Sequence, residues 1–423
     1  MRSRTATLAL LTSLNLLNYL DRYLVMAVGP KIQESLGLDD SQIGWVISAF
    51  MLGYFLTSPI FGWLGDRFPR KWLIAAGVVV WSAATVLSGF AGSLGSLIAA
   101  RVLVGVGEAS YATLSPTIID DLADERSKNR YLAIFYVATP VGSALGFLVG
   151  GWLDHRYGWR SAFFIAGGPG LALALLTLFL REPARASLDG GARTAPRPAR
   201  EVYAELWRRP LYVATVAGYI AQTFALGGFT AWAAPLLYRK LCLELHIADA
   251  QFGAVTVVTG LLGTVLGGWL ADRWPGEDRT RVCLKVCALS SALAAPLALV
   301  ALSMPTPTGF LIALGACELA VFASVAPTNA AVLLSVPPAL RANAMAASIF
   351  AIHLLGDLIS PPLIGAISDS YGDARSFCSG AAGLQIGMYL LPVALAVSAF
   401  AWWRGSARGA GGARDACATS TSG

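Results

Sequence analysis

Residues 62–69 read Gly-Trp-Leu-Gly-Asp-Arg-Phe-Pro, and residues 268–275 repeat the pattern as Gly-Trp-Leu-Ala-Asp-Arg-Trp-Pro. Each copy follows a long apolar run, and that run is the second of its half of the chain. A repeat at equivalent places of two halves indicates a duplicated architecture. The chain is therefore expected to consist of two related bundles.

The chain around these copies has the composition of a membrane protein. It has 423 residues, of which 56% are hydrophobic and 13% are charged, whereas soluble domains have about 45–50% apolar and about 25% charged residues. Twelve apolar runs are long enough to cross a bilayer core about 30 Å thick, at 6–30, 42–64, 72–92, 95–119, 131–153, 161–180, 211–238, 251–271, 282–303, 308–335, 344–367 and 381–403. Backbone groups in lipid must be satisfied within each segment. The predicted fold class is therefore an all-α integral membrane protein with twelve transmembrane helices in two pseudo-symmetric six-helix bundles.

The longest polar stretch sets the domain limits. Residues 181–210 carry seven arginines and several Pro and Gly residues, and they separate six runs from six. This composition predicts a linker, with a short interfacial helix near 201–209. The predicted domains are an N-terminal six-helix bundle at 1–180, a cytoplasmic linker at 181–210, a C-terminal six-helix bundle at 211–404, and a disordered cytoplasmic tail at 405–423.

The positive charges predict the orientation. Most of the 31 lysines and arginines lie in the segments assigned to the cytoplasmic side, whereas six are assigned to the outside: Lys31, Arg156, Arg160, Arg239, Lys240 and Arg375. Positively charged loops remain in the cytoplasm. The sequence thus predicts a multi-pass protein of the cytoplasmic (inner) membrane with both termini in the cytoplasm. The first run is expected to be retained, because polar residues interrupt it where a signal peptide is plainly apolar.

Several other classes of protein are disfavoured. The formal net charge of +6 arises from basic residues between apolar runs, so no nucleic-acid partner is expected. The six cysteines include no CxxC pair, and the three histidines include no HExxH motif. The cysteines are accordingly interpreted as small apolar residues outside disulfides, and no metal site is expected. No phosphate-binding loop of the type GxxxxGK[ST] occurs either, which disfavours an ATP-driven pump.

Four ionisable residues interrupt the apolar runs of the first half. Asp21 and Arg22 lie in the first run, and Arg101 and Glu108 lie in the fourth. The spacing of Arg101 and Glu108, seven residues apart, places both on one helical face. Each such charge costs roughly 2.5–3.5 kcal/mol at a helix centre unless it faces a partner or water. These four groups are therefore expected to share one polar cavity.

The repeated stretch resembles the loop motif of the major facilitator superfamily, in which a glycine is followed by Asp-Arg and further basic residues. Pro69 departs from the glycine that is usual there. The resemblance implies a conformational latch, assigned here to residues of both copies: Gly62, Asp66, Arg67, Arg70, Asp272 and Arg273.

Further motifs resemble the spinster family, of bacterial type. They are Asn18-Tyr19-Leu20-Asp21-Arg22 in the first run, the stretches 101–111 and 115–121 around the fourth, and Gly-Trp-Arg-Ser-Ala-Phe-Phe at 158–164. Spinster-type transporters move sphingolipids such as sphingosine-1-phosphate, or lysophospholipids. The resemblance implies a proton-coupled secondary active transporter that works by alternating access, with Asp21 as the protonatable group and Arg101 with Glu108 as the central charge pair.

Substrate contacts are expected from both halves of the chain. Arg101 is the candidate for binding a phosphate or zwitterionic head group, and Glu108 would tune it. The other candidates are Arg22, Asn18, Tyr111, Thr230, Trp232 and His353. The expected partners are an amphiphilic or lipid substrate, protons and the bilayer. The proton gradient is the expected energy source, no cofactor is expected, and the chain is expected to be a monomer.

Alternatives remain open at this point. A proton-coupled multidrug exporter and an uncoupled lipid facilitator are consistent with the same pattern. The chain is predicted not to be an enzyme, because His353 and Asp357, four residues apart, lack a convincing serine or cysteine partner. His353, Asp357 and Glu318 could equally make hydrogen bonds between helices.

Glycines in the fifth run have two interpretations. Pro140 and a series of glycines at helical spacing are loosely similar to the antiporter motif of drug-exporting major facilitators. Alternatively, these small residues allow close helix packing. In that case Gly142, Gly146, Gly150 and Gly151 are expected to contact the eighth run at Gly260, Gly263 and Gly267.

Overall fold

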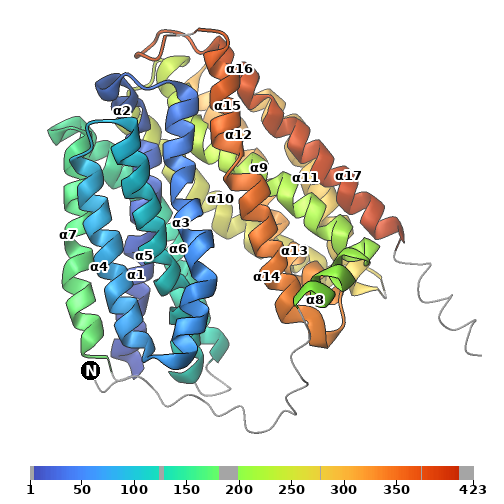
Figure 1. The fold of residues 1–423 in the computed structure, drawn as a ribbon. Coiled ribbons are helices and arrows are strands. Elements are labelled where there is room, and N and C mark those ends of the chain that lie inside the picture. The colour runs from blue at the N-terminus through green and yellow to red at the C-terminus, as the bar shows by residue number, and fades with distance from the viewer. Residues whose placement is uncertain (1–3, 123–127, 181–198, 277, 373, 409–423) are drawn as a thin grey trace, which may run out of the picture. The chain divides into compact units, whose positions relative to one another are not determined.

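The computed structural model describes residues 4–122, 128–180, 199–276, 278–372 and 374–408 (Figure 1). The described residues are mostly helical and contain no strand. They form two compact units. Unit 1 comprises Met1–Gly191, Ala231–Val257 and Pro361–Leu384, and unit 2 comprises Ala192–Thr230, Val258–Ser360 and Gln385–Gly423.

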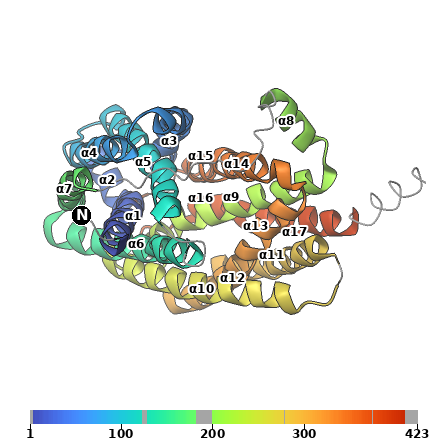
Figure 2. The same cartoon turned by 90° about the horizontal axis from the view of Figure 1, so that it is seen from below.

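Unit 1 contains the first seven helices of the chain. They are α1 (Arg4–Ala27), α2 (Gly29–Leu36), α3 (Asp40–Arg67), α4 (Arg70–Gly89), α5 (Leu94–Leu122), α6 (Lys128–Tyr157) and α7 (Trp159–Leu178). Figure 2 views these helices nearly end-on and shows α3 beside α5 and α1 beside α6. A Cβ atom on Gly105 of α5 would lie 1.8 Å from the backbone oxygen of Phe50 in α3. Only glycine permits this approach, which brings the two helices into backbone contact.

Two long helices begin in one unit and end in the other. They are α9 (Pro210–Arg239) and α10 (Leu245–Arg273), since unit 1 includes residues 231–257. The remaining elements are α8 (Ala199–Trp207), α11 (Arg279–Ser303), α12 (Pro307–Ala323), α13 (Val325–Leu334), a 3₁₀ turn at Pro338–Leu340, α14 (Arg341–Ile352), the π-helix η2 (His353–Asp357), α15 (Ser360–Asp369), α16 (Ala382–Met388) and α17 (Leu390–Arg408).

The predicted all-α membrane fold is confirmed. Eleven helical segments within the described residues are long and apolar enough to cross a membrane. The first predicted run forms α1, which has 24 residues but is not among the eleven, because the polar residues inside it lower its hydropathy. Together they account for the twelve predicted runs. Three of those runs are broken: α12 gives way to α13, α14 to the π-helix and α15, and α16 to α17.

Two of these breaks have a local cause in proline. Pro327 lies in the first turn of α13, and Pro361 and Pro362 lie in the first turn of α15. Proline lacks a backbone N–H and is tolerated at helix starts rather than in helix interiors. A continuous apolar run thus becomes two helices that meet at a bend.

The predicted domain limits are only partly covered by the described residues. Most of the predicted linker at 181–210 lies outside them, but α8 occupies the place of the short helix predicted near 201–209. Residues 409–423 of the predicted tail also lie outside them, whereas α17 continues to Arg408. The division into bundles at 1–180 and 211–404 stays a prediction.

Candidate functional site

Four charged side chains lie together in the interior of unit 1. Asp21 and Arg22 come from α1, and Arg101 and Glu108 come from α5. Asp21 is 1% exposed, and Arg101 and Glu108 are fully buried. Asp21 and Arg101 each interact electrostatically with the other three groups. The structure therefore brings together the four embedded charges that the sequence singles out.

The direct ion pair of this cluster is between Arg22 and Glu108. The Nη2 atom of Arg22 lies 2.7 Å from Oε2 of Glu108. The guanidinium of Arg22 also lies over the ring of Phe50, 4.6 Å from its centre. Arg101 and Glu108, the predicted central charge pair, interact electrostatically, and α1 adds Arg22 as the residue that contacts Glu108 directly.

Asp21 and Arg101 have few hydrogen bonds. Thr85 of α4 donates a hydrogen bond of 2.5 Å to Oδ2 of Asp21, and Oδ1 has no hydrogen-bond partner among the described residues. None of the three guanidinium nitrogens of Arg101 has such a partner there either. A buried guanidinium without hydrogen bonds is costly, and its charge is balanced by Asp21 and Glu108 rather than by water.

This arrangement can couple the protonation of Asp21 to the binding of an anionic group at Arg101. An ionised Asp21 attracts the guanidinium of Arg101. A proton on Asp21 removes that attraction and makes the donors of Arg101 available to another acceptor. A guanidinium offers five N–H donors in a planar fork that matches phosphate and carboxylate oxygens.

The other predicted contact residues of unit 1 have mainly structural partners. Tyr111 is buried and donates its hydroxyl to the backbone oxygen of Leu11. Trp232 is 1% exposed, and its indole N–H donates to the backbone oxygen of Pro361 at 3.1 Å. Asn18 is also buried, and its Nδ2 has no hydrogen-bond partner among the described residues. Asn18 is thus the one of the three whose polar group is available to a ligand.

Unit 2 contains the remaining predicted contact residues. Nδ1 of His353 lies 2.7 Å from Oδ2 of Asp357, so the predicted pair four residues apart is present. Both residues belong to the π-helix η2, and short π segments inside α-helices are frequent at functional sites. The hydroxyl of Thr230 is bonded to the backbone oxygen of Leu226 at 2.7 Å. Glu318 accepts a hydrogen bond of 3.0 Å from Thr259, as the structural interpretation of this residue predicts.

The first copy of the repeated motif contains a buried ion pair. Nη2 of Arg70 lies 2.6 Å from Oδ2 of Asp121 at the end of α5, and Arg70 Nη1 donates to Thr117 at 3.0 Å. Arg70 is 5% exposed. Neither Asp121 nor Thr117 was predicted as a partner of Arg70, although both lie in the stretch 115–121 and Asp121 falls at the same predicted membrane face as Arg70.

The other members of that copy have different surroundings. Arg67 lies over the ring of Trp63, 4.0 Å from its centre. A Cβ atom on Gly62 would have 4.0 Å to its nearest neighbour, whereas one on Gly65 would lie 2.3 Å from a side-chain carbon of Leu114. The close approach of α3 to α5 at this end is therefore made at Gly65 rather than at the predicted Gly62.

In the second copy the corresponding charges are exposed. Asp272 lies 2.9 Å from Arg279, with side chains 80% and 46% exposed. Arg273 lies over the ring of Trp269, 4.6 Å from its centre. Exposed pairs contribute about 0–1 kcal/mol. The ion pair of the first copy is therefore expected to contribute more to stability than the exposed ion pair of the second copy.

Arg70→Gln is expected to lower the stability of the protein, because it leaves Asp121 without its ion pair. Loss of one partner of a buried pair costs about 3–5 kcal/mol, and Asp121 is partly exposed, so we expect a cost of about 1–3 kcal/mol. Thermal unfolding of the purified protein measures it. Arg279→Gln in the second copy is the matched control, with an expected change below about 1 kcal/mol. Equal effects of the two substitutions would contradict the assignment.

A second buried network, which was not predicted, lies where α3 begins. Arg239 donates to both carboxylate oxygens of Asp40, at 2.9 Å each, and to Gln33 at 2.7 Å. Ser368 of α15 donates to Asp40 at 2.6 Å. Arg239 and Asp40 are 1% and 2% exposed. This network, called the Asp40 network below, joins α2 and α3 to the ends of α9 and α15.

A neighbouring carboxylate caps the same helix. Asp369 accepts hydrogen bonds of 2.8 Å from the backbone N–H groups of Asp40 and Ser41, in the first turn of α3. Carboxylates at helix N-termini are stabilising because they accept from unpaired N–H groups and oppose the helix dipole. Arg375 in turn pairs with Asp369 at 2.9 Å. Only Arg239 and Arg375 carried a sequence signal, as positive charges placed outside.

One prediction about the cysteines is wrong. Cys242 and Cys378 form a disulfide, with 4.5 Å between their Cα atoms, whereas Cys283, Cys287 and Cys317 are free and buried as expected. The two bonded residues are 136 positions apart, and neither lies in a paired-cysteine motif. Their position in segments that follow apolar runs, both assigned to the outside, was the available signal.

The expected packing of the glycines is also corrected. Gly142 and Gly146 of α6 face the backbone of α1, where added Cβ atoms would lie 2.5 Å and 2.6 Å from the oxygens of Leu16 and Leu20. Gly263 of α10 faces Leu319 of α12 instead. Close packing through small residues also joins α6 to α10 as predicted, but at Gly151 and Gly253 rather than at Gly260, Gly263 and Gly267.

Sequence comparison places this chain among known proteins. Residues 11–351 match the Major Facilitator Superfamily. Human protein spinster homolog 1 is 36% identical over 387 residues, which cover 85% of this chain and 72% of the human protein. The sphingosine-1-phosphate transporter SPNS2 of Danio rerio is 36% identical over 393 residues, with 88% and 77% covered. Protein spinster of Drosophila melanogaster is 34% identical over 385 residues; the match covers 87% of this chain and 62% of the fly protein, so it spans less than two thirds of that relative.

Solved structures show the same fold. A bacterial homolog to the human lysosomal transporter spinster, in an inward-facing and unoccupied conformation, has a TM-score of 0.84 at 24% identity, with 96% of this chain and 97% of that chain covered. A D-xylose–proton symporter has a TM-score of 0.76 at 17% identity, with 95% and 98% covered. These similarities confirm the predicted architecture.

Proposed function

The chain belongs to the major facilitator superfamily and, within it, to the spinster family, and from this premise we propose that it is a proton-coupled transporter of an amphiphilic lipid. Its family consists of membrane transporters, and the chain is a multi-pass membrane protein. The proposed substrates are sphingosine-1-phosphate, which the relative from Danio rerio is named for, and lysophospholipids.

The observation that carries this proposal is the buried Arg101. Its guanidinium has no hydrogen-bond partner among the described residues and is flanked by the carboxylates of Asp21 and Glu108. A phosphate group would supply the acceptors that this guanidinium lacks. Glu108 is already paired with Arg22, which leaves Asp21 as the carboxylate that competes with a head group for Arg101.

Coupling to protons follows from that competition. An anionic head group at Arg101 makes an ionised Asp21 less favourable, and a proton on Asp21 makes the head group more favourable. By linkage, the two binding events strengthen each other by the same factor. Thr85, which donates to Asp21, holds the carboxyl in place in either protonation state. Asp21 is thus the proposed proton site, with Arg101 and Glu108 as the groups that set its affinity.

The Asp40 network supports alternating access. The residues of this network lie at the end of the helices that the positive charges assign to the outside. The disulfide Cys242–Cys378 lies at the same end, and disulfides persist in oxidising compartments outside the cytoplasm. We propose that the network holds this outer end closed, and that the pair Arg70–Asp121 acts at the cytoplasmic end, with both termini in the cytoplasm.

Arg101→Gln tests the head-group assignment. We expect affinity for sphingosine-1-phosphate or a lysophospholipid to fall at least about tenfold, since a charge-assisted hydrogen bond contributes about 1.5–3 kcal/mol. Binding to the purified protein is measured by titration with fluorescent lipid. Arg101→Lys should recover part of the affinity because it keeps the charge without the planar fork. Unchanged lipid affinity in Arg101→Gln would contradict the proposal.

A transport assay separates the proposed function from the two alternatives. In proteoliposomes with an imposed pH gradient, uphill movement of labelled lipid supports the proposed function. Movement of a cationic dye without movement of lipid would instead identify a multidrug exporter. Lipid movement that is indifferent to the gradient would identify an uncoupled facilitator.

A further inference from the structure

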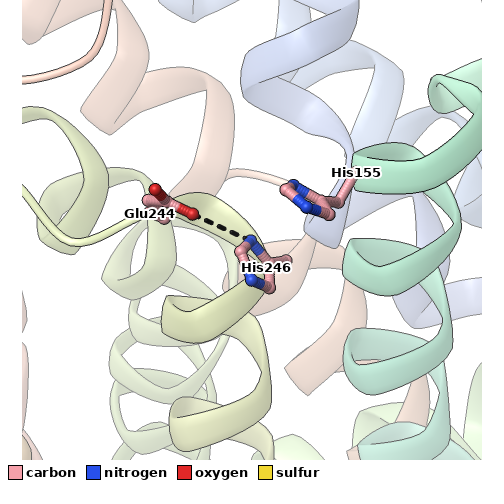
Figure 3. Close-up of side chains that lie close together, drawn as sticks. All are labelled: His155, Glu244 and His246. Atoms are coloured by element: carbon pink, nitrogen blue, oxygen red, sulfur yellow. Dashed lines mark ion pairs between the residues drawn. The ribbon is translucent and has the colours of Figure 1, made fainter.

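Two histidines that are far apart in the sequence meet at one end of unit 1. His155 lies near the end of α6, and Glu244 and His246 lie where α10 begins (Figure 3). The ring centroids of His155 and His246 are 4.1 Å apart, and the two ring planes are inclined by 32°. Nδ1 of His246 lies 3.5 Å from Oε2 of Glu244. One ligand atom from each of the three residues lies within 4.8 Å of the other two.

A buried carboxylate lies directly beneath these residues. Asp249 is one turn from His246 on α10 and is fully buried, and neither of its oxygens has a hydrogen-bond partner among the described residues. It faces α6 at Gly151, where a Cβ atom would lie 2.7 Å from its carboxylate and 3.1 Å from the Cα of His246. Gly151 is one turn from His155, so the carboxylate lies between the same two helix faces as the histidines.

A second carboxylate, Asp154, adjoins His155 on α6 and interacts with it electrostatically. Asp154 interacts electrostatically with Asp249. Asp154 also interacts with Lys31 and Glu34, of which Lys31 is the cation; Lys31 is itself paired with Glu34 at 2.8 Å. Asp154 and Asp249 thus place two carboxylates beside the histidine pair, where they favour a bound cation, while Arg156 and Lys240 lie in the same two segments of the chain.

We propose that His155, His246 and Glu244 form a binding site for a divalent transition-metal ion of the Zn²⁺ class. Two imidazoles and one carboxylate form a common Zn²⁺ ligand set that leaves a fourth position for water. Imidazole ligands select such ions over Mg²⁺ and Ca²⁺, which prefer oxygen ligands. Tetrahedral ligation at about 2.0–2.1 Å requires the three side chains to close in by rotation about their own torsions, which their partial exposure permits.

Metal binding would fix α6 to α10. The ligands come from the last turn of one helix and the first turn of the other, and both lie at the predicted outer end. An ion bound there would stabilise only conformations in which these two helix ends remain together. Inhibition of transport by Zn²⁺ added from the outside follows from this, and that consequence rests on the proposed function, whereas the binding site itself does not.

The binding site is tested with the full chain purified without a histidine tag. Calorimetric titration with ZnCl₂ and the thermal unfolding temperature are measured for the wild type, His155→Asn and His246→Asn. We expect Zn²⁺ to bind and to raise the unfolding temperature of the wild type. Each substitution should weaken the affinity at least about tenfold, since loss of even an outer-shell partner costs 10–100-fold. His353→Asn, the remaining histidine of the chain, is the matched control and should bind Zn²⁺ like the wild type.

Several results would overturn the site. They are a wild type that does not bind Zn²⁺, a His155→Asn or His246→Asn variant that binds it unchanged, and a wild type that binds Mg²⁺ as tightly as Zn²⁺. Transport of labelled lipid in proteoliposomes, with Zn²⁺ outside, is the second measurement. Inhibition of wild-type transport that is lost in His155→Asn supports the proposal that the bound ion holds α6 to α10. Zn²⁺ that binds without inhibiting transport contradicts that proposal. Proteoliposomes that transport no lipid at all would refute the proposed function and leave the binding result in force.

Discussion

Asp21→Asn is expected to abolish uphill, gradient-driven transport while the protein remains folded and still binds its lipid. The asparagine is close in size and can keep the hydrogen bond with Thr85, but its amide group does not gain or lose a proton in the physiological pH range. It imitates the protonated state, in which Arg101 is available to the head group. Lipid affinity should therefore be equal to that of the wild type or higher, and it should no longer depend on pH through this residue.

The measurement compares two kinds of lipid movement in the same proteoliposomes. Accumulation against a concentration difference under an imposed pH gradient should be lost in Asp21→Asn. Exchange of labelled for unlabelled lipid at equilibrium requires no proton movement and should persist. Asp21→Glu is the matched control, because it keeps an ionisable carboxyl group and should recover part of the accumulation. Wild-type accumulation in Asp21→Asn would refute the assignment of the proton site.

Arg239→Gln is expected to release the predicted outer end of the molecule. Asp40 would remain buried with only the longer ion pair to Arg375, 3.6 Å away, although Gln33 and Ser368 would still donate to it. Breaking a buried pair in this way costs about 3–5 kcal/mol. We expect a lower unfolding temperature and amide exchange at the start of α3 that is faster by a factor on the order of 10²–10³.

Two further variants make this expectation specific. The double variant Asp40→Asn with Arg239→Gln removes both charges and should recover much of the loss, because no unpaired buried charge remains. Lys31→Gln is the matched control at the same end: Lys31 and Glu34 are 32% and 35% exposed, and exposed pairs contribute about 0–1 kcal/mol. A double variant as impaired as Arg239→Gln would show that the charge pair is not the cause.

The fold was largely predictable from the sequence because each span is a continuous apolar run with its own charged or Pro/Gly limits. The breaks within runs were less so. Helices α12 and α13 form one apolar stretch, and a proline in such a stretch is compatible either with a kink or with a new helix start. The first span, α1, was identified from its length despite the charges that lower its hydropathy.

The candidate site was predictable in its residues but not in its pairing. A charge inside an apolar run is visible in the sequence, and Asp21, Arg22, Arg101 and Glu108 were all found that way. Which of them are in contact depends on how α1 is rotated and positioned along its axis relative to α5. The spacing of residues within one helix gives no information on this. The Asp40 network, the disulfide and the histidine pair could not be predicted for the same reason, because their members come from segments far apart in the chain.

The disulfide also joins two loops at the predicted outer end. Cys242 and Cys378 follow closely after Arg239 and Arg375, and the backbone N–H groups of Cys378 and Gly380 donate to the oxygens of Tyr238 and Arg239. The two loops are thereby joined into one rigid piece that carries both arginines. Arg239 binds Asp40 directly, and Arg375 lies 3.6 Å from it. We therefore expect any backbone movement that separates these loops from α3 to withdraw both arginines from Asp40 together.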